Sequence, residues 1–299
     1  MGQSSSAAGR HRHRLAATVG ISATILVVEL VAAFASNSLA LFADAGHVFA
    51  DVSGIALSWA AVWVAARPRS GERSFGLYRL EIVAAAVNAV VLLAIAVFVV
   101  YEAVRRFTDP PPVQPGIVIV VAVIALLANA LSLRVLAPGR NESLTVRGVY
   151  LEVLGDALGA IAVLASGVVI ATTGWLQADA VASIVVAALI VPRTVSLLRD
   201  SVDVLLEATP KGVSLADVRR HILEAPGVTD VHDLHAWTIT SGMNVVSAHV
   251  VLAADGKPGD VLDHLGRCLA DDFDVNHSTF QLETPEHVAW EARLAQPQH

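Results

Sequence analysis

The chain has 299 residues, of which 55% are hydrophobic and only 16% are charged, and its formal net charge is −7. Soluble domains are usually about a quarter charged. The composition therefore excludes an ordinary soluble protein and indicates a polytopic membrane protein with some soluble mass. The single cysteine, Cys268, excludes an intrachain disulfide and a cysteine-based zinc finger.

Six stretches are apolar and long enough to cross a bilayer as helices, which takes about 20 residues each. Short polar or Pro/Gly-rich segments separate them. The predicted spans are 15–35, 39–66, 80–104, 115–136, 147–172 and 177–198. Basic residues precede the first span, as in a signal peptide, but no cleavage site breaks it cleanly, so we predict a retained first helix.

The charge changes sign along the chain, because residues 1–199 carry a net charge of +3 and residues 200–299 carry −10. A membrane half is thus followed by an acidic soluble half. We predict a basic tail at 1–14, a six-helix transmembrane transport domain at 15–199, a soluble domain at 200–284 and a flexible tail at 285–299.

Arginines gather on one side of the predicted bundle. They lie in the N-terminal tail, in the second and fourth breaks and at the end of the sixth span, whereas the opposite breaks hold only Arg105 and Arg106. Loops rich in Lys and Arg stay in the cytoplasm. We therefore predict a multi-pass protein of the cell (inner) membrane with both termini and the acidic domain in the cytoplasm.

The soluble half alternates helical and strand-like segments. Residues 214–227 predict a short helix with Ser214 as its N-cap. Two strands rich in β-branched residues follow at 228–240 and 243–253, joined by Ser241-Gly242, then an amphipathic helix at 258–273 and a third strand at 277–283. The sequence predicts a small α+β domain in the order αββαβ.

Ionisable residues inside the second and fifth spans are the main functional signal. His47 and Asp51 are four residues apart, and so are Glu152 and Asp156. Each pair lies on one face of its helix, separated by about 6 Å along the axis. A charged group at mid-membrane costs about 2.5–3.5 kcal/mol. Two facing pairs would offer one nitrogen and three carboxylates to a small dication, and the ion's charge would offset the burial. Protons could occupy the empty site instead, which is the basis of an antiporter.

The simpler explanation is that these side chains form interhelical hydrogen bonds or salt bridges. No Lys or Arg lies within the apolar centres of the six spans to neutralise three carboxylates, which disfavours that explanation. Asp44 could be an entry group, a ligand or an interfacial residue. Helix capping is expected of Asp179. For Glu29, Asn88 and Asn129 interhelical bonding is the preferred account.

Several motifs, taken together and in order, resemble the cation diffusion facilitator family in its bacterial zinc, cadmium and cobalt exporter branch. They are LFADAGHVFADV, RSFGLYRLEIVAA, YLEVLGDALG, VHDLHAWTIT, SAHVV and FQLE. The resemblance implies six transmembrane helices, a cytoplasmic metallochaperone-like domain that binds metal and dimerises, a homodimer, and export of Zn²⁺ in exchange for protons. It places the transport site on His47, Asp51, Glu152 and Asp156. No enzymatic activity and no nucleic-acid partner are expected.

Glu152 departs from the resemblance, because zinc-exporting members usually have histidine at this position of helix five. A carboxylate makes the site harder and more anionic, which suits Mn²⁺ or Mg²⁺ better than imidazole does. His47 still supplies nitrogen, so zinc remains the first expectation, with Cd²⁺, Co²⁺, Fe²⁺ and Mn²⁺ as alternatives. His47 and a carboxylate must then carry the exchanged protons.

A second group of potential metal ligands lies on the three predicted strands. The resemblance places a cytoplasmic site on His232, His249 and Glu283, where Zn²⁺ would be a regulatory ligand. His277 shares a strand face with Glu283 but lies about 20 Å away along the strand, so it would belong to a second ion or reach across the dimer. His235 points to the other face. His264 could complete a site, while Cys268 is expected to be a buried small residue.

Two segments near the membrane are assigned no metal. The pair His11 and His13 is interpreted as part of a basic anchor, and the loop 67–76 lacks both His and Asp. The competing functions are an intramembrane hydrolase, for which no HExxH-type motif is present, and a membrane-bound metal sensor or scaffold that binds metal without moving it.

Overall fold

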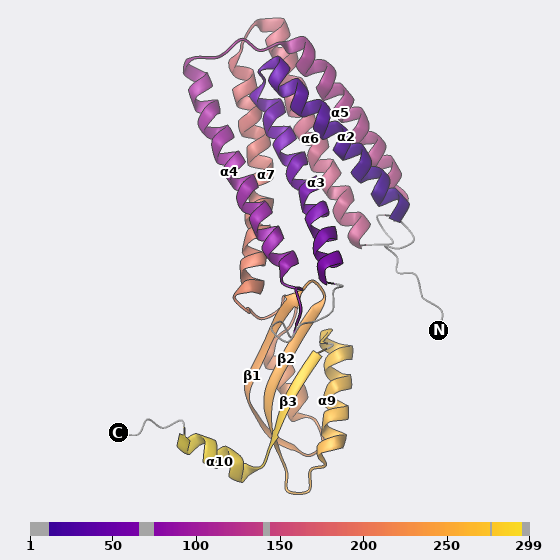
Figure 1. Cartoon of the computed structure of the whole chain (residues 1–299), viewed down its shortest axis with the longest axis vertical. Coiled ribbons are helices and arrows are strands. Elements are labelled where there is room, and N and C mark those ends of the chain that lie inside the picture. Colours follow the sequence, from indigo (N-terminus) through magenta and orange to yellow (C-terminus); the bar gives the residue numbers. More distant parts are fainter. Residues whose placement is uncertain (1–11, 66–74, 140–143, 276, 295–299) are drawn as a thin grey trace. The chain divides into compact units, whose positions relative to one another are not determined.

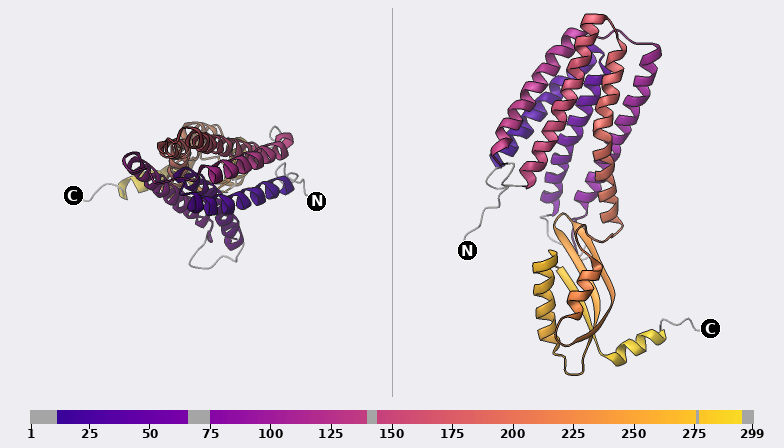
Figure 2. Two further views of the ribbon diagram at one scale, coloured as in Figure 1. Left: turned by 90° about the horizontal axis from the view of Figure 1, so that it is seen from above. Right: turned by 180° about the vertical axis from the view of Figure 1, so that it is seen from behind.

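The computed structural model describes residues 12–65, 75–139, 144–275 and 277–294. The chain divides into two compact units, one made of 1–60 and 84–198 and the other of 61–83 and 199–299. The first is a bundle of long helices and the second is built around a small sheet (Figures 1 and 2).

The helices of the bundle follow the predicted spans closely. They are α2 (Arg12–Ser36), α3 (Leu39–Ala65), α4 (Leu80–Thr108), α5 (Pro115–Leu136), α6 (Leu144–Thr173) and α7 (Gln177–Leu205), with a 3₁₀ turn, η1, at Ala137–Gly139. Five of them meet the length and hydropathy needed to cross a membrane among the described residues. The sixth, α3, has the length at 27 residues, and its apolar run is interrupted by Asp44, His47 and Asp51. The prediction of six transmembrane helices is confirmed.

Helix α5 packs against both α2 and α6, and Figure 1 shows α2 and α5 side by side. Small side chains such as Ala122 and Ala125 are fully buried along α5, which lets helix backbones approach closely, as is usual in membranes. Large apolar side chains such as Val27, Phe34 and Leu127 are exposed on the outside of the bundle. An apolar exterior is the surface that a lipid-embedded protein requires.

The start of α3 is held by a carboxylate from another helix. Asp179 of α7 accepts hydrogen bonds from the Ser38 hydroxyl and, at 2.7 Å, from the backbone N–H of Leu39. Asn37, in the preceding turn, adopts a positive φ of 56°, which Asn tolerates better than most residues. Capping is thus confirmed for Asp179, but the helix that it caps is α3 rather than its own.

The second unit contains the sheet and its helices in the predicted order αββαβ. The elements are α8 (Leu215–Leu223), β1 (Val228–Thr240), β2 (Met243–Leu252), α9 (Pro258–Phe273), β3 (His277–Glu283) and α10 (Pro285–Leu294). The sheet order is β1-β2-β3, with β1 and β2 antiparallel and β2 and β3 parallel. The parallel pair needs a crossover, and α9 supplies it.

Local signals explain where these elements begin and end. The Ser214 side chain accepts a hydrogen bond from the Asp217 N–H and caps α8, as predicted. Gly242 has a φ of 75° in the tight turn between β1 and β2, a conformation that favours glycine. The segment 285–299 was predicted as a flexible tail, but ten of its residues form α10, so this part is helical rather than loose.

Candidate metal sites

Three of the four side chains predicted for the transport site converge in the helix bundle. His47 and Asp51 lie one turn apart on α3, and Asp156 approaches them from α6. The His47 Nε2 atom is 3.5 Å from Asp51 Oδ2 and 3.1 Å from Asp156 Oδ1. One ligand atom from each residue lies within 4.8 Å of the others. The i,i+4 spacing on α3 therefore places both of its side chains toward α6, as the sequence predicts.

This cluster is largely shielded and incompletely satisfied. His47 and Asp156 are buried and Asp51 is partly buried. Within the described residues, the buried Nδ1 atom of His47 has no hydrogen-bond partner. Buried polar atoms are normally paired with protein or water. The group can therefore accept a further partner, such as a cation, a proton or a water molecule.

Glu152, the fourth predicted ligand, is engaged elsewhere. Its Oε1 atom lies 2.9 Å from Nη2 of Arg193 on α7. Glu152, Arg193 and His47 all line one cavity of about 210 Å³, which Asp44 also borders. The apolar centres of the spans hold no Lys or Arg, but the long Arg193 side chain extends from the end of the predicted sixth span and pairs with Glu152, so one of the three carboxylates does have a cationic partner.

Two further carboxylates lie close to the cluster, and the sequence analysis gave them less weight. Glu29 of α2 and Asp44 of α3 are both almost fully buried and are hydrogen-bonded to each other. Asp44 also fits closely against α6, because a Cβ atom on Gly159 would lie 2.9 Å from its Oδ1. Asp44 is therefore an interior group of the bundle. Bonding between Glu29 and Asp44 agrees with the interhelical role expected for Glu29.

The three side chains predicted for the cytoplasmic site also converge. His232 Nε2 lies 3.0 Å from Glu283 Oε2, and His249 Nδ1 lies 2.7 Å from Glu283 Oε1. His232 and His249 are directly paired across β1 and β2. Burial raises the pKa of Glu283, but hydrogen bonds from Gln281 and His232 and the nearby His249 outweigh it, so the pKa lies below its ordinary value.

A β-bulge changes what surrounds this second cluster. The β1–β2 register shifts between His232 and His235, and Asp233 in the bulge has a φ of 50°. Asp233 Oδ1 lies 3.0 Å from His235 Nε2, and its Oδ2 lies 3.8 Å from His249 Nε2. The hydrogen bond from His235 lowers the pKa of Asp233. Sequence reasoning missed Asp233 because the bulge depends on the pairing of two strands; an acidic residue between two histidines in a strand was the available signal.

His277 lies away from these three ligands, as its distance along the strand predicted. Its ring packs edge-on against Phe75, with 5.8 Å between centroids.

Asn88 forms the interhelical hydrogen bond that the sequence predicts for it. Its side chain donates to the Ala50 carbonyl at 2.9 Å. His11 and the loop residues 66–74 lie outside the described part of the chain.

Comparison with known proteins gives matches over most of the sequence. Residues 15–206 match the family model of the cation efflux transmembrane domain, and residues 210–285 match that of the cation efflux protein cytoplasmic domain. The metal cation efflux system protein CzcD of Cupriavidus metallidurans is 41% identical over 92% of this chain and 87% of its own length.

Two other relatives are similar over comparable lengths. The zinc transporter ZitB of Escherichia coli is 38% identical, covering 90% of this chain and 87% of its own. The cadmium, cobalt and zinc/H⁺–K⁺ antiporter of Bacillus subtilis is 33% identical over 91% of this chain and 89% of its own. A solved metal-bound C-terminal domain of CzcD is 46% identical, covers 24% of this chain and 99% of that domain, and has a TM-score of 0.23.

Proposed function

The chain belongs to the cation efflux family of membrane metal transporters, and on that premise we propose that it exports Zn²⁺ from the cytoplasm in exchange for protons. The buried group of His47, Asp51 and Asp156 carries this proposal. Imidazole nitrogen and carboxylate oxygen are ligands that zinc accepts. One relative is named as a zinc transporter and another as a cadmium, cobalt and zinc antiporter, so Cd²⁺ and Co²⁺ are the next candidates.

Exchange with protons follows from the chemistry of the same donors. A metal ligand must release its proton before it binds the ion, so metal and protons compete for His47, Asp51 and Asp156. Three anionic or basic groups packed within a membrane bundle are too costly to leave charged and empty. The site is therefore refilled by protons when the metal leaves. The Bacillus subtilis relative, named as an antiporter of metal against H⁺ and K⁺, supports this coupling.

Glu152 is proposed as a fourth ligand that Arg193 holds back. Both side chains line the cavity that His47 borders, so Glu152 is near the ion's position. Its ion pair with Arg193 neutralises the carboxylate in the metal-free protein. Arrival of a divalent ion would provide a stronger positive field and draw Glu152 away from the guanidinium.

The second cluster, His232, His249 and Glu283, is proposed to bind Zn²⁺ as a regulatory ligand. Two nitrogens and a buried carboxylate within 4.8 Å fit a zinc-type donor set. Asp233 stands close enough to His249 to join or orient this set. When bound, the ion would cross-link β1, β2 and β3, which stiffens the domain that a homodimer of this family uses to associate.

We further propose that both termini face the cytoplasm across the inner membrane of a bacterium. Arginine-rich connections on one side of the bundle carry this orientation. A cysteine-free variant with single cysteines placed in either connection type would test it by labelling in intact cells. Labelling of a 109–114 cysteine with protection of an N-terminal one is the expected pattern, and the reverse pattern would refute it.

Transport itself is tested by metal uptake into proteoliposomes under an imposed pH gradient. Zn²⁺, Cd²⁺, Co²⁺, Fe²⁺ and Mn²⁺ are compared in the native protein and in Asp51→Ala. Zinc flux that depends on the gradient and disappears in the variant is expected. Binding of Zn²⁺ without flux of any ion would instead favour a membrane-bound sensor or scaffold. Flux of manganese or iron alone would keep the transporter and make Glu152 the determinant of selectivity.

A further inference from the structure

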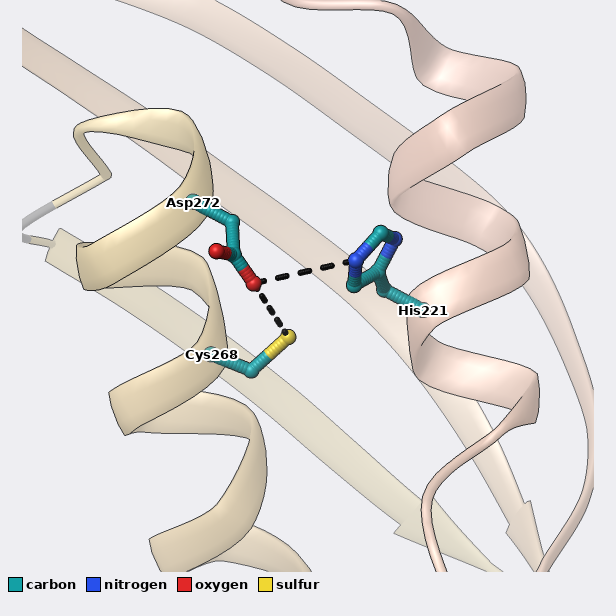
Figure 3. Close-up of side chains that lie close together, drawn as sticks. All are labelled: His221, Cys268 and Asp272. Carbon is teal, nitrogen blue, oxygen red and sulfur yellow. Dashed lines mark hydrogen bonds and ion pairs between the residues drawn. The ribbon is translucent and has the colours of Figure 1, made fainter.

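A third group of potential metal ligands lies in the soluble unit, apart from the two clusters above. Figure 3 shows His221 on α8 facing Cys268 and Asp272 on α9. The His221 Nε2 atom is 3.7 Å from Asp272 Oδ2, and the Cys268 Sγ is 3.8 Å from the same oxygen. One ligand atom from each residue lies within 4.8 Å of the others. The two helices thus bring nitrogen, sulfur and oxygen donors to one point.

The imidazole of His221 is oriented as metal-binding histidines usually are. Its Nδ1–H donates a hydrogen bond to the Asp217 carbonyl, one turn earlier on α8, at 3.0 Å. The ring also packs edge-on against Phe273, with 5.0 Å between centroids and 90° between planes. Nε2 is therefore the ring nitrogen that faces Asp272. Metal-binding histidines commonly donate the N–H of their other ring nitrogen to a backbone carbonyl in this way.

Cys268 and Asp272 lie four residues apart on α9, so their side chains leave the helix on one face. The thiol donates to the Asp272 carboxylate. The cysteine is only partly buried, which corrects the expectation of a buried packing residue. Partial exposure leaves a path for an ion and room for water as a further ligand.

The acidic surroundings also favour a cation. Glu224 and Asp271 lie near enough to act electrostatically on the Cys268 thiol. A plain ion pair between α8 and α9 is the simpler explanation of the contact between His221 and Asp272. Partly exposed pairs of that kind add little to stability, and they need no thiol at the meeting point. The added sulfur is what makes the group suited to a softer metal.

We propose that His221, Cys268 and Asp272 form a third metal site, which takes a borderline or soft divalent ion such as Zn²⁺, Cd²⁺ or Co²⁺. Its three protein ligands leave one position of a tetrahedral ion to water. An open, partly exposed site of this kind exchanges its ion readily with the surrounding solution. Metal binding at this site therefore does not depend on transport through the membrane cluster.

Cobalt provides a selective test, because Cys268 is the only cysteine of the chain. A thiolate bound to Co²⁺ gives a near-ultraviolet sulfur-to-cobalt charge-transfer band. Neither of the other two clusters contains a cysteine, so that band reports this site alone. The full chain, purified in detergent and stripped of metal, is titrated with Co²⁺. We expect the band to saturate at one cobalt–thiolate unit per chain and to vanish when Zn²⁺ or Cd²⁺ is added.

Variants then distinguish a site formed by all three side chains from a Cys268 thiol that binds Co²⁺ without help from His221 and Asp272. His221→Gln and Asp272→Asn should each weaken cobalt binding at the band by about tenfold or more, by comparison with typical losses at metal sites. Asp260→Asn removes the same charge from the first turn of α9, two turns before Cys268, and should leave the titration unchanged. Circular dichroism of every variant checks that the domain is folded.

Two results would overturn the proposal. One is the absence of a charge-transfer band in the native chain at saturating Co²⁺, which needs no variant to interpret. The other is a band whose titration is the same in His221→Gln and Asp272→Asn as in the native chain.

Discussion

The membrane cluster and the strand cluster use the same kinds of ligand but differ in how well each is satisfied without metal. In the strand cluster both oxygens of Glu283 face histidines, and Gln281 donates a further hydrogen bond at 2.6 Å. In the membrane cluster the Nδ1 atom of His47 lacks a partner among the described residues. The strand cluster is therefore satisfied by its own side chains, whereas the membrane cluster leaves one buried nitrogen available to a further partner.

This difference suits two tasks. A site that is stable with and without its ion can report the metal concentration, because neither state is strongly disfavoured. A site that must hold either metal or protons couples the two, because emptying it is costly in a medium of low polarity.

The same chemical change in both clusters should give the largest difference. Asp156→Asn removes a carboxylate charge from the membrane cluster, and Glu283→Gln removes one from the strand cluster. We expect zinc flux to fall on the order of 100-fold in the first variant, at the upper end of losses seen around metal sites. In the second, flux should persist while the zinc concentration for half-maximal rate rises by about fivefold, a modest coupling.

Proteoliposome uptake over a range of Zn²⁺ concentrations measures both quantities. Glu102→Gln is the control, because Glu102 pairs with Arg105 and Arg106 on α4 away from the cluster. Equal losses of flux in Asp156→Asn and Glu283→Gln would contradict the proposal that the membrane cluster transports the ion and the strand cluster regulates transport.

Gly159→Ala should disturb the membrane cluster through packing rather than charge. The added methyl would lie 2.9 Å from Asp44 Oδ1, so Asp44 must move, at a cost of about 1–3 kcal/mol for an overpacked interior. Gly155→Ala, one turn earlier on the same helix, meets no described atom within 4 Å. The thermal unfolding temperature in detergent and the rate of zinc flux should both fall in Gly159→Ala and stay unchanged in Gly155→Ala. Equal behaviour of the two variants would show that Asp44 tolerates displacement.

Removing the ion pair between Arg193 and Glu152 tests whether Glu152 is a metal ligand that sets selectivity. Arg193→Gln removes the guanidinium that pairs with Glu152, and a partly exposed ion pair is worth at most about 1 kcal/mol. Zinc should therefore bind up to about fivefold more tightly, as measured by calorimetry. Glu152→His should shift transport toward zinc over manganese. Unchanged affinity in Arg193→Gln, together with an unchanged zinc-to-manganese ratio in Glu152→His, would remove Glu152 from the site.

The smallest expected effect is a loss of stability of the strand cluster at low pH. The pKa of Glu283 lies below its ordinary value of 4.5 in the folded domain. Its ionised form therefore stabilises the fold above that value, and the contribution disappears as the pH falls through the lowered pKa. In the metal-free chain, hydrogen exchange of the β3 amides, corrected for its intrinsic pH dependence, should show protection falling over this window. Glu283→Gln should show a flatter profile. An identical pH profile in the variant would contradict the assigned cause.

Much of the fold was predictable because its signals are local. Apolar runs of about 20 residues, arginine-rich breaks and alternating strands each lie within one stretch of chain. The αββαβ order and the six helices were predicted on those signals and are confirmed. Helix α10 was missed because it has only 10 residues, which is too short for a clear helical pattern, and lies in a polar terminal segment.

The pairing of i,i+4 residues was also a local inference, since helix geometry alone places His47 beside Asp51. The residues that share a site across elements required more. Asp156 joins His47 only because α3 and α6 meet, and Glu152 turns to Arg193 because α7 brings a long cationic side chain within 2.9 Å. Single-sequence periodicity does not reveal which helices are neighbours.

The sequence by itself thus determined the elements, the membrane character and the faces on which ionisable residues lie, since these depend on neighbours within a few positions. Only the tertiary structure decided which carboxylate meets which cation, that Asp233 stands beside His249, and that the single cysteine meets His221. These contacts join residues far apart in the chain, and their distances are fixed by the packing of whole helices and strands.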